Sequence, residues 1–146
     1  MSMTLKDFLN KYGEDSTSNF QLLKWAKDLD IKPFKVVMRN ELYKLKKTKK
    51  NYIIANYQTS NEKGIHWVAM YRSSQQNFYF DPYGITLFKE AEEFLVKGIY
   101  STFQIQPSGS KMCGQLCLFL LFKLSKGFDF FDIILEMSEA PALLND

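Results

Sequence analysis

Two cysteines and a single histidine are the side chains of this sequence that point most directly to nucleophilic chemistry. Cys113 lies where a loop rich in Pro, Gly and Ser, residues 106–112, meets an apolar run that extends to Leu124. This run predicts a helix buried on nearly every face, ended by Gly127. A thiol at the start of such a helix feels the positive end of the helix dipole, which favours the thiolate, and the backbone N–H groups there can stabilise an oxyanion. The alternative for Cys113 is a small hydrophobic residue of the core.

The second cysteine, Cys117, lies one helical turn further along the apolar run and is expected to be a core residue. A disulfide with Cys113 is not expected, because two cysteines without a secretory signal are typical of a reducing compartment. One histidine and two cysteines four residues apart do not form a standard zinc site, so neither a metal nor another cofactor is predicted.

A thiolate nucleophile needs a base, and that base needs an acceptor that fixes its tautomer. The base candidate is His66, in the strand-like run 65–71, although a lone histidine is usually structural. Asp81 ends the next strand-like run and would lie beside His66 if the two strands are antiparallel neighbours; equally, it could form a turn before Pro82. Gln106 is a candidate amide donor to the oxyanion, or simply a loop residue.

Two amphipathic helices are expected at the beginning of the chain. The first, after a Thr4 cap, carries Leu5, Phe8, Leu9 and Tyr12 on one face and ends at Gly13. The second is capped by Ser18 or Asn19. Its inward side chains are expected to be Phe20, Leu22, Leu23, Ala26 and Leu29.

The remaining chain reads as strands followed by helices. Strand-like runs occupy residues 34–38, 51–57, 65–71, 78–80 and 99–105, and helical patterns occupy residues 40–46, 88–97 and 129–138. Because short turns join the three central strands, we expect an antiparallel meander. The order of the elements predicts an α+β fold.

The length of 146 residues suits one domain, residues 1–146, with a single core. Hydrophobic residues make up 46% and aromatic residues 16%, which excludes a disordered chain. The N-terminus has no hydrophobic signal core and the longest apolar stretch is too short to span a bilayer. A non-secreted, monomeric protein is therefore expected.

One strongly basic run could bind nucleic acid or another polyanion, although a solvated surface loop is the more common explanation for such a run. Its basic residues are Lys44, Lys46, Lys47, Lys49 and Lys50. The run has no recognised nucleic-acid motif, so it is a weak indication.

Four short elements, in their order and spacing, resemble the signature of the adenovirus protease (adenain) and its relatives. They are His66-Trp67, the six residues from Tyr79 to Gly84, Gln106, and Cys113-Gly114. The relatives include the SUMO-deconjugating proteases and the capsid-maturation proteases of large DNA viruses, virophages and Maverick-type transposons. The resemblance covers residues 51–124.

The resemblance implies a papain-like fold in the circular arrangement of adenain, with a central antiparallel or mixed sheet flanked by helices. It implies that Cys113 is the nucleophile, His66 the general base, Asp81 the residue that orients His66, and Gln106 part of the oxyanion hole. Trp67 would wall a narrow substrate slot that favours small residues near the scissile bond. DNA could be an activator through the basic run, whereas the cysteine with which adenain captures its activating peptide has no counterpart.

The function that this resemblance implies is a cysteine endopeptidase that matures viral capsid or other virion precursors, in the host cell and the virion. The first alternative is an isopeptidase that removes ubiquitin or SUMO. An acyltransferase and a nucleic-acid-binding module are further alternatives.

Overall fold

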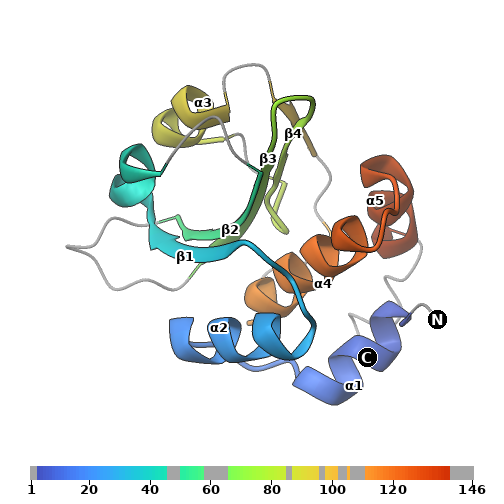
Figure 1. The fold of residues 1–146 in the computed structure, drawn as a ribbon. Coiled ribbons are helices and arrows are strands. Elements are labelled where there is room, and N and C mark those ends of the chain that lie inside the picture. The colour runs from blue at the N-terminus through green and yellow to red at the C-terminus, as the bar shows by residue number, and fades with distance from the viewer. Residues whose placement is uncertain are drawn as a thin grey trace.

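The structure, a computed structural model, describes residues 3–45, 50–57, 66–84, 87–95, 98–101, 105 and 111–138. Its elements are α1 (Leu5–Tyr12), α2 (Asn19–Asp28), β1 (Phe34–Met38), the 3₁₀ helix η1 (Arg39–Lys44), β2 (Asn51–Asn56), β3 (Trp67–Arg72), β4 (Asn77–Phe80), α3 (Lys89–Leu95), β5 (Ile99–Tyr100), α4 (Cys113–Ser125) and α5 (Phe130–Ser138). Together they form the α+β architecture shown in Figure 1.

The strands form one mixed sheet in the order β1-β2-β3-β4-β5. The predicted meander is confirmed for β2, β3 and β4, which pair antiparallel, whereas β1 runs parallel to β2 and β5 runs parallel to β4. The predicted strand 99–105 is too long, because β5 ends at Tyr100 and the described Ser101 and Ile105 lie outside it. Their N–H groups donate to the carbonyls of Tyr79 and Pro82, so the chain continues along the edge of β4 and its turn.

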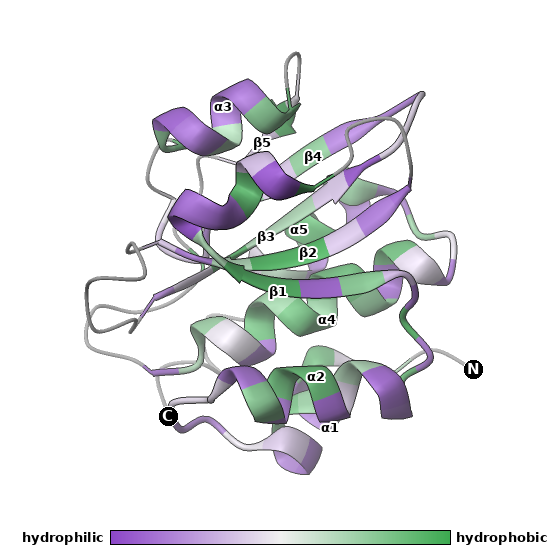
Figure 2. Ribbon diagram, turned by 60° about the vertical axis from the view of Figure 1, so that its left-hand side comes forward, coloured by the Kyte–Doolittle hydropathy of each residue, from purple (hydrophilic) through white to green (hydrophobic). Residues whose placement is uncertain are grey.

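Alternate side chains of the central strands enter two separate cores, one on each face of the sheet. On one face Ile54, Ala69 and Phe80 join the core formed with α1, α2, α4 and α5; on the other Ile53, Val68 and Tyr79 join the core formed with α3 and η1. Figure 2 shows the same layers, with the hydrophobic helix α4 against the sheet and α1 and α2 beyond it.

The two N-terminal helices begin and end as their sequences predict. Thr4 and Ser18 each cap a helix through a reciprocal capping box, and Gly13 ends α1 with a φ of 81°. The inward face predicted for α2 is partly wrong, since Phe20 is 76% and Leu23 is 43% exposed. Leu22, Ala26 and Leu29 are buried. Their spacing of four and three residues defines one face, and Phe20 and Leu23 point away from it.

The apolar run after Cys113 forms the central helix of the larger core, as predicted. All α4 residues from Cys113 to Lys123 are buried, and Gly127 follows the helix with a φ of 91°. The predicted helices 40–46, 88–97 and 129–138 correspond to η1, α3 and α5, whose described parts are shorter. Within the described residues, every helix is too short or too polar to cross a membrane.

Candidate active site

The antiparallel pairing of β3 with β4 brings His66 and Asp81 to one end of the sheet. The last paired residues there are Ala69 and Phe80; His66 directly precedes β3, and Asp81 directly follows β4. Helix α4 packs on this part of the sheet, and its first residue is Cys113. Three residues that are far apart in the sequence therefore meet at one place, as the sequence predicted.

His66 and Asp81 form a short, buried hydrogen bond. His66 Nε2 lies 2.7 Å from Asp81 Oδ1, and the two side chains are 10% and 0% exposed. The same oxygen accepts the N–H of Tyr83 at 2.8 Å, and the Gly84 N–H donates to the Asp81 carbonyl. Gly84 has a φ of 71°, a conformation that this turn requires and that glycine adopts without strain. Asp81 is thus both a turn former and the partner of His66.

The Cys113 sulfur is held by the main chain that follows His66. The Trp67 N–H donates to Cys113 Sγ at 3.4 Å. The other imidazole nitrogen, Nδ1, is buried and makes no hydrogen bond of ordinary geometry within the described residues, yet the sulfur is close enough to affect the pKa of His66. A loose contact of this kind between an imidazole and a thiol can tighten when a ligand binds.

The electrostatics of the site favour a protonated imidazole. Burial, the largest single effect, lowers the pKa of His66, but the hydrogen bond to Asp81, the close contact with Cys113 and the charges of both groups together raise it from 6.5 to about 9. The ring of Tyr83 lies 4.7 Å from the imidazole between ring centres and covers one side of it. His66 can therefore carry a positive charge beside the sulfur at neutral pH.

The loop between α1 and α2 forms a wall of this site that the sequence did not predict. Its Thr17 carbonyl accepts the Trp67 indole N–H at 3.2 Å, and its Asp15 carbonyl accepts the Gln115 amide at 2.8 Å. Gly114 packs directly against this loop, because a Cβ atom there would lie 2.1 Å from Thr17 Oγ1. In the sequence, the sign of this close packing was the glycine that follows Cys113 at the start of the predicted helix.

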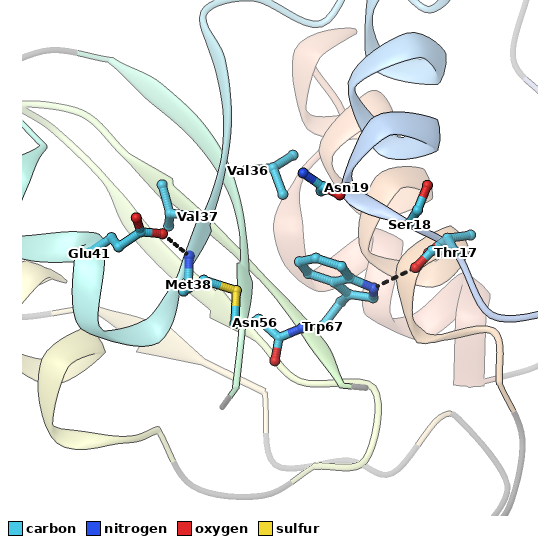
Figure 3. A pocket seen from close by; sticks show the side chains of 9 residues that line it. All are labelled: Thr17, Ser18, Asn19, Val36, Val37, Met38, Glu41, Asn56 and Trp67. Carbon is cyan, nitrogen blue, oxygen red and sulfur yellow. Dashed lines mark hydrogen bonds between the residues drawn. The ribbon is translucent and has the colours of Figure 1, made fainter. Parts of the chain in front are cut away.

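A pocket of about 320 Å³ opens beside Trp67 (Figure 3). It lies between the start of α2, strand β1 and η1, and its walls include Thr17, Asn19, Val36, Met38 and Glu41. Glu41 Oε1 accepts the Met38 N–H at 2.8 Å, which fixes a carboxylate in the wall. Two of the lining residues, Thr17 and Trp67, also pack near Gly114, the residue that follows Cys113.

Several predicted site residues cannot be placed relative to this cluster. Gln106 lies outside the described residues, as do Lys46, Lys47 and Lys49. Lys44 and Lys50 are described and exposed; their ammonium groups lie over the rings of Tyr43 and Tyr52, respectively. Among the described residues, no group of three His, Cys, Asp or Glu side chains has the arrangement of a metal site.

The fold is similar to that of a protease. One solved structure that it resembles is the selenomethionine form of the ASFV pS273R protease, with a TM-score of 0.59 and 15% sequence identity. The similarity covers 89% of this chain and 68% of that chain. No protein-family model and no curated protein sequence matches this chain. The comparison supports the mixed α+β fold, and the roles of individual residues rest on the geometry of the site.

Proposed function

We propose that this protein is a cysteine endopeptidase with Cys113 as nucleophile, His66 as general base and acid, and Asp81 as the residue that orients His66. The observation that carries the proposal is the position of His66, hydrogen-bonded to a fully buried carboxylate and close enough to Cys113 for the sulfur to raise its pKa. A nucleophile, a base and an orienting acceptor are the three roles that thiol catalysis needs.

The reaction begins as the Cys113 proton passes to His66, which gives a thiolate beside an imidazolium. The sulfur attacks the peptide carbonyl carbon, and the C=O electron pair moves to oxygen. The N-terminus of α4 supplies the Cys113 N–H as a donor to this oxyanion, and Gln106 is our candidate for a second donor. His66 then protonates the leaving amine, and water, deprotonated by His66, hydrolyses the thioester.

The substrate is a protein, and we favour a capsid or other virion precursor that is cleaved in the host cell or virion. The similarity to an ASFV protease supports a viral setting. Two residues that line the pocket, Thr17 and Trp67, also pack near Gly114, and we propose that this pocket receives a substrate side chain. We also propose that small substrate residues are preferred near the scissile bond.

Substitution of the nucleophile tests the function directly. We expect Cys113→Ala to lose about 10⁴-fold or more of the peptidase activity, because no sulfur remains to form the acyl-enzyme. Mass-spectrometric mapping of cleavage in a co-expressed capsid precursor measures the activity. Unchanged cleavage by Cys113→Ala would refute the proposal.

A matched control is available in Cys117→Val, which removes the other thiol while keeping a buried side chain of similar size. Cleavage must survive in this variant, at a reduced rate, while it disappears in Cys113→Ala. An electrophilic ubiquitin or SUMO probe tests the isopeptidase alternative, since efficient covalent capture at Cys113 would move the assignment to a deconjugating enzyme.

A further inference from the structure

The main chain of Trp67 lies beyond the last residue of β4 with which β3 pairs. The N–H of Tyr57 donates to the His66 carbonyl, and the N–H of Ser73 donates to the Gln76 carbonyl. Because ladder bonds alternate sides along an antiparallel strand, the peptide groups of residues 67, 69 and 71 point toward β4. Strand β4 ends at Phe80, opposite Ala69. The residue that would pair with Trp67 is Pro82, which has no N–H to donate.

Two sulfur atoms of α4 form hydrogen bonds to the Trp67 main chain where β4 does not. The Trp67 N–H donates to Cys113 Sγ at 3.4 Å, and Cys117 Sγ donates to the Trp67 carbonyl at 3.3 Å. Cys113 and Cys117 are one helical turn apart and therefore lie on the same face of the helix. Both main-chain polar groups of Trp67 are thus hydrogen-bonded to the two thiols of the chain.

We infer that Cys117 is a positioning residue for the nucleophile, which holds the Trp67 main chain so that its N–H points at the sulfur of Cys113. The inference rests on the proposed function of Cys113. When the Cys117 S–H bonds to the Trp67 carbonyl, it fixes the start of β3 against the first turn of α4. His66 directly precedes Trp67, so the same contact also fixes the distance between the base and the nucleophile.

The burial and protonation of the Cys117 thiol suit this role. The side chain is fully buried, and burial, together with the nearby charges of Cys113 and Asp81, raises the pKa of its thiol well above the ordinary value. Cys117 therefore remains an S–H donor at the pH values at which Cys113 can ionise. A merely apolar side chain of the same size would fill the space and leave the Trp67 carbonyl without this donor.

The test is the pH dependence of Cys113 alkylation by iodoacetamide, followed by peptide mass spectrometry. This reaction reports thiolate formation whether or not the protein cleaves peptides, so it separates the inference from the proposed function. In Cys117→Ala and Cys117→Val we expect the midpoint to rise by about 0.5 pH units or more, because Trp67 N–H no longer stabilises the thiolate. Cys117→Ser, which restores a donor, should recover at least half of the shift.

Leu121→Val is the matched control for lost packing, since Leu121 lies one turn further along the buried helix. It should be less stable than the wild type and keep the wild-type midpoint. An unchanged midpoint in Cys117→Ala and Cys117→Val would overturn the inference. A shift that serine fails to reverse, or that Leu121→Val reproduces, would assign the effect to packing and overturn it equally.

A second measurement needs no activity. In Cys113→Ala the only remaining thiol is that of Cys117, because the chain has two cysteines. Its S–H stretching band should lie at a lower frequency than that of a free thiol, as expected for a hydrogen-bond donor. A band at the free-thiol frequency would contradict the contact with the Trp67 carbonyl.

The kinetics of peptide cleavage give a third readout. The kcat of Cys117→Val should fall about three- to tenfold, while its KM stays within about twofold of the wild-type value.

Discussion

At the scale of single residues, the chemistry of the site depends on whether the His66 imidazole is protonated. His66 is buried, which would normally keep it neutral, but Asp81 and Cys113 together raise its pKa to about 9. The carboxylate is itself held by the Tyr83 N–H, so it cannot turn away from the ring without losing a second bond. A base that remains protonated until an acyl group has formed can serve as the acid that releases the amine.

The first prediction concerns the alkaline limb of peptidase activity. In the proposed mechanism His66 donates a proton to the leaving amine, so kcat/KM should fall as pH rises through about 9. In Asp81→Asn the limb should move to lower pH by about one unit or more, because the carboxylate charge is lost. NMR titration of the imidazole checks both values directly, as the chain has one histidine.

The raised pKa of His66 also makes the free energy of unfolding depend on pH. The folded pKa of about 9 exceeds the ordinary value of 6.5, so the stabilisation from the imidazolium is complete below pH 6.5. It is lost as pH rises from 6.5 to about 9. Chemical denaturation at several pH values should show this loss in the wild type and a smaller one in Asp81→Asn. Equal losses would contradict the role of Asp81.

At the scale of elements, the site depends on contact between the first turn of α4 and the loop that precedes α2. The loop carbonyls of Asp15 and Thr17 accept side-chain N–H groups from Gln115 and Trp67, respectively. These bonds attach the N-terminal helices to both elements that position the catalytic groups. Gly114 is the point of closest approach, with space for a hydrogen atom only.

The second prediction follows from this approach. Gly114→Ala places a Cβ 2.1 Å from Thr17 Oγ1, so the Thr17 side chain or its loop must shift. We expect a loss of about 1–3 kcal/mol in the free energy of unfolding, measured by urea denaturation, and a lower kcat/KM. Thr17→Ala removes the atom in contact and should restore most of the stability in the double variant. If the two substitutions were additive, the contact would be refuted.

At the scale of the whole molecule, the sheet separates two cores, and the aromatic side chains of the larger one connect the sheet to the C-terminal helices. The Phe78 ring on β4 stacks on the Phe130 ring on α5 at 4.5 Å, with an angle of 4° between the planes. Phe8 on α1 meets Phe119 on α4 edge to face. The strands and helices are therefore held in one arrangement by contacts between residues that are far apart in the sequence.

The third prediction compares two adjacent phenylalanines of α5. Phe130 is 2% exposed and Phe131 is 60% exposed. Phe130→Ala should lower the free energy of unfolding by about 3–5 kcal/mol, since a buried ring and its stacking partner are lost. Phe131→Ala should change it by less than about 1 kcal/mol. Thermal and urea unfolding check the pair, and similar effects of the two substitutions would contradict the packing of α5.

The sequence by itself determined the local features of the protein. The caps Thr4 and Ser18 and the position of Cys113 at a helix start follow from short-range backbone hydrogen bonding, which neighbouring residues fix. Short turns likewise indicated the central meander, and from it the proximity of His66 and Asp81.

Only the tertiary structure decided which groups complete the site. Phe20 and Leu23 are apolar like their buried neighbours, and only the packing of α2 showed which of its faces is buried. Cys117 looked like an ordinary core residue until the end of β4 was known, because its role depends on the carbonyl that Pro82 leaves without a donor. Bonds between distant segments depend on register and packing, which the periodicity of one segment does not contain.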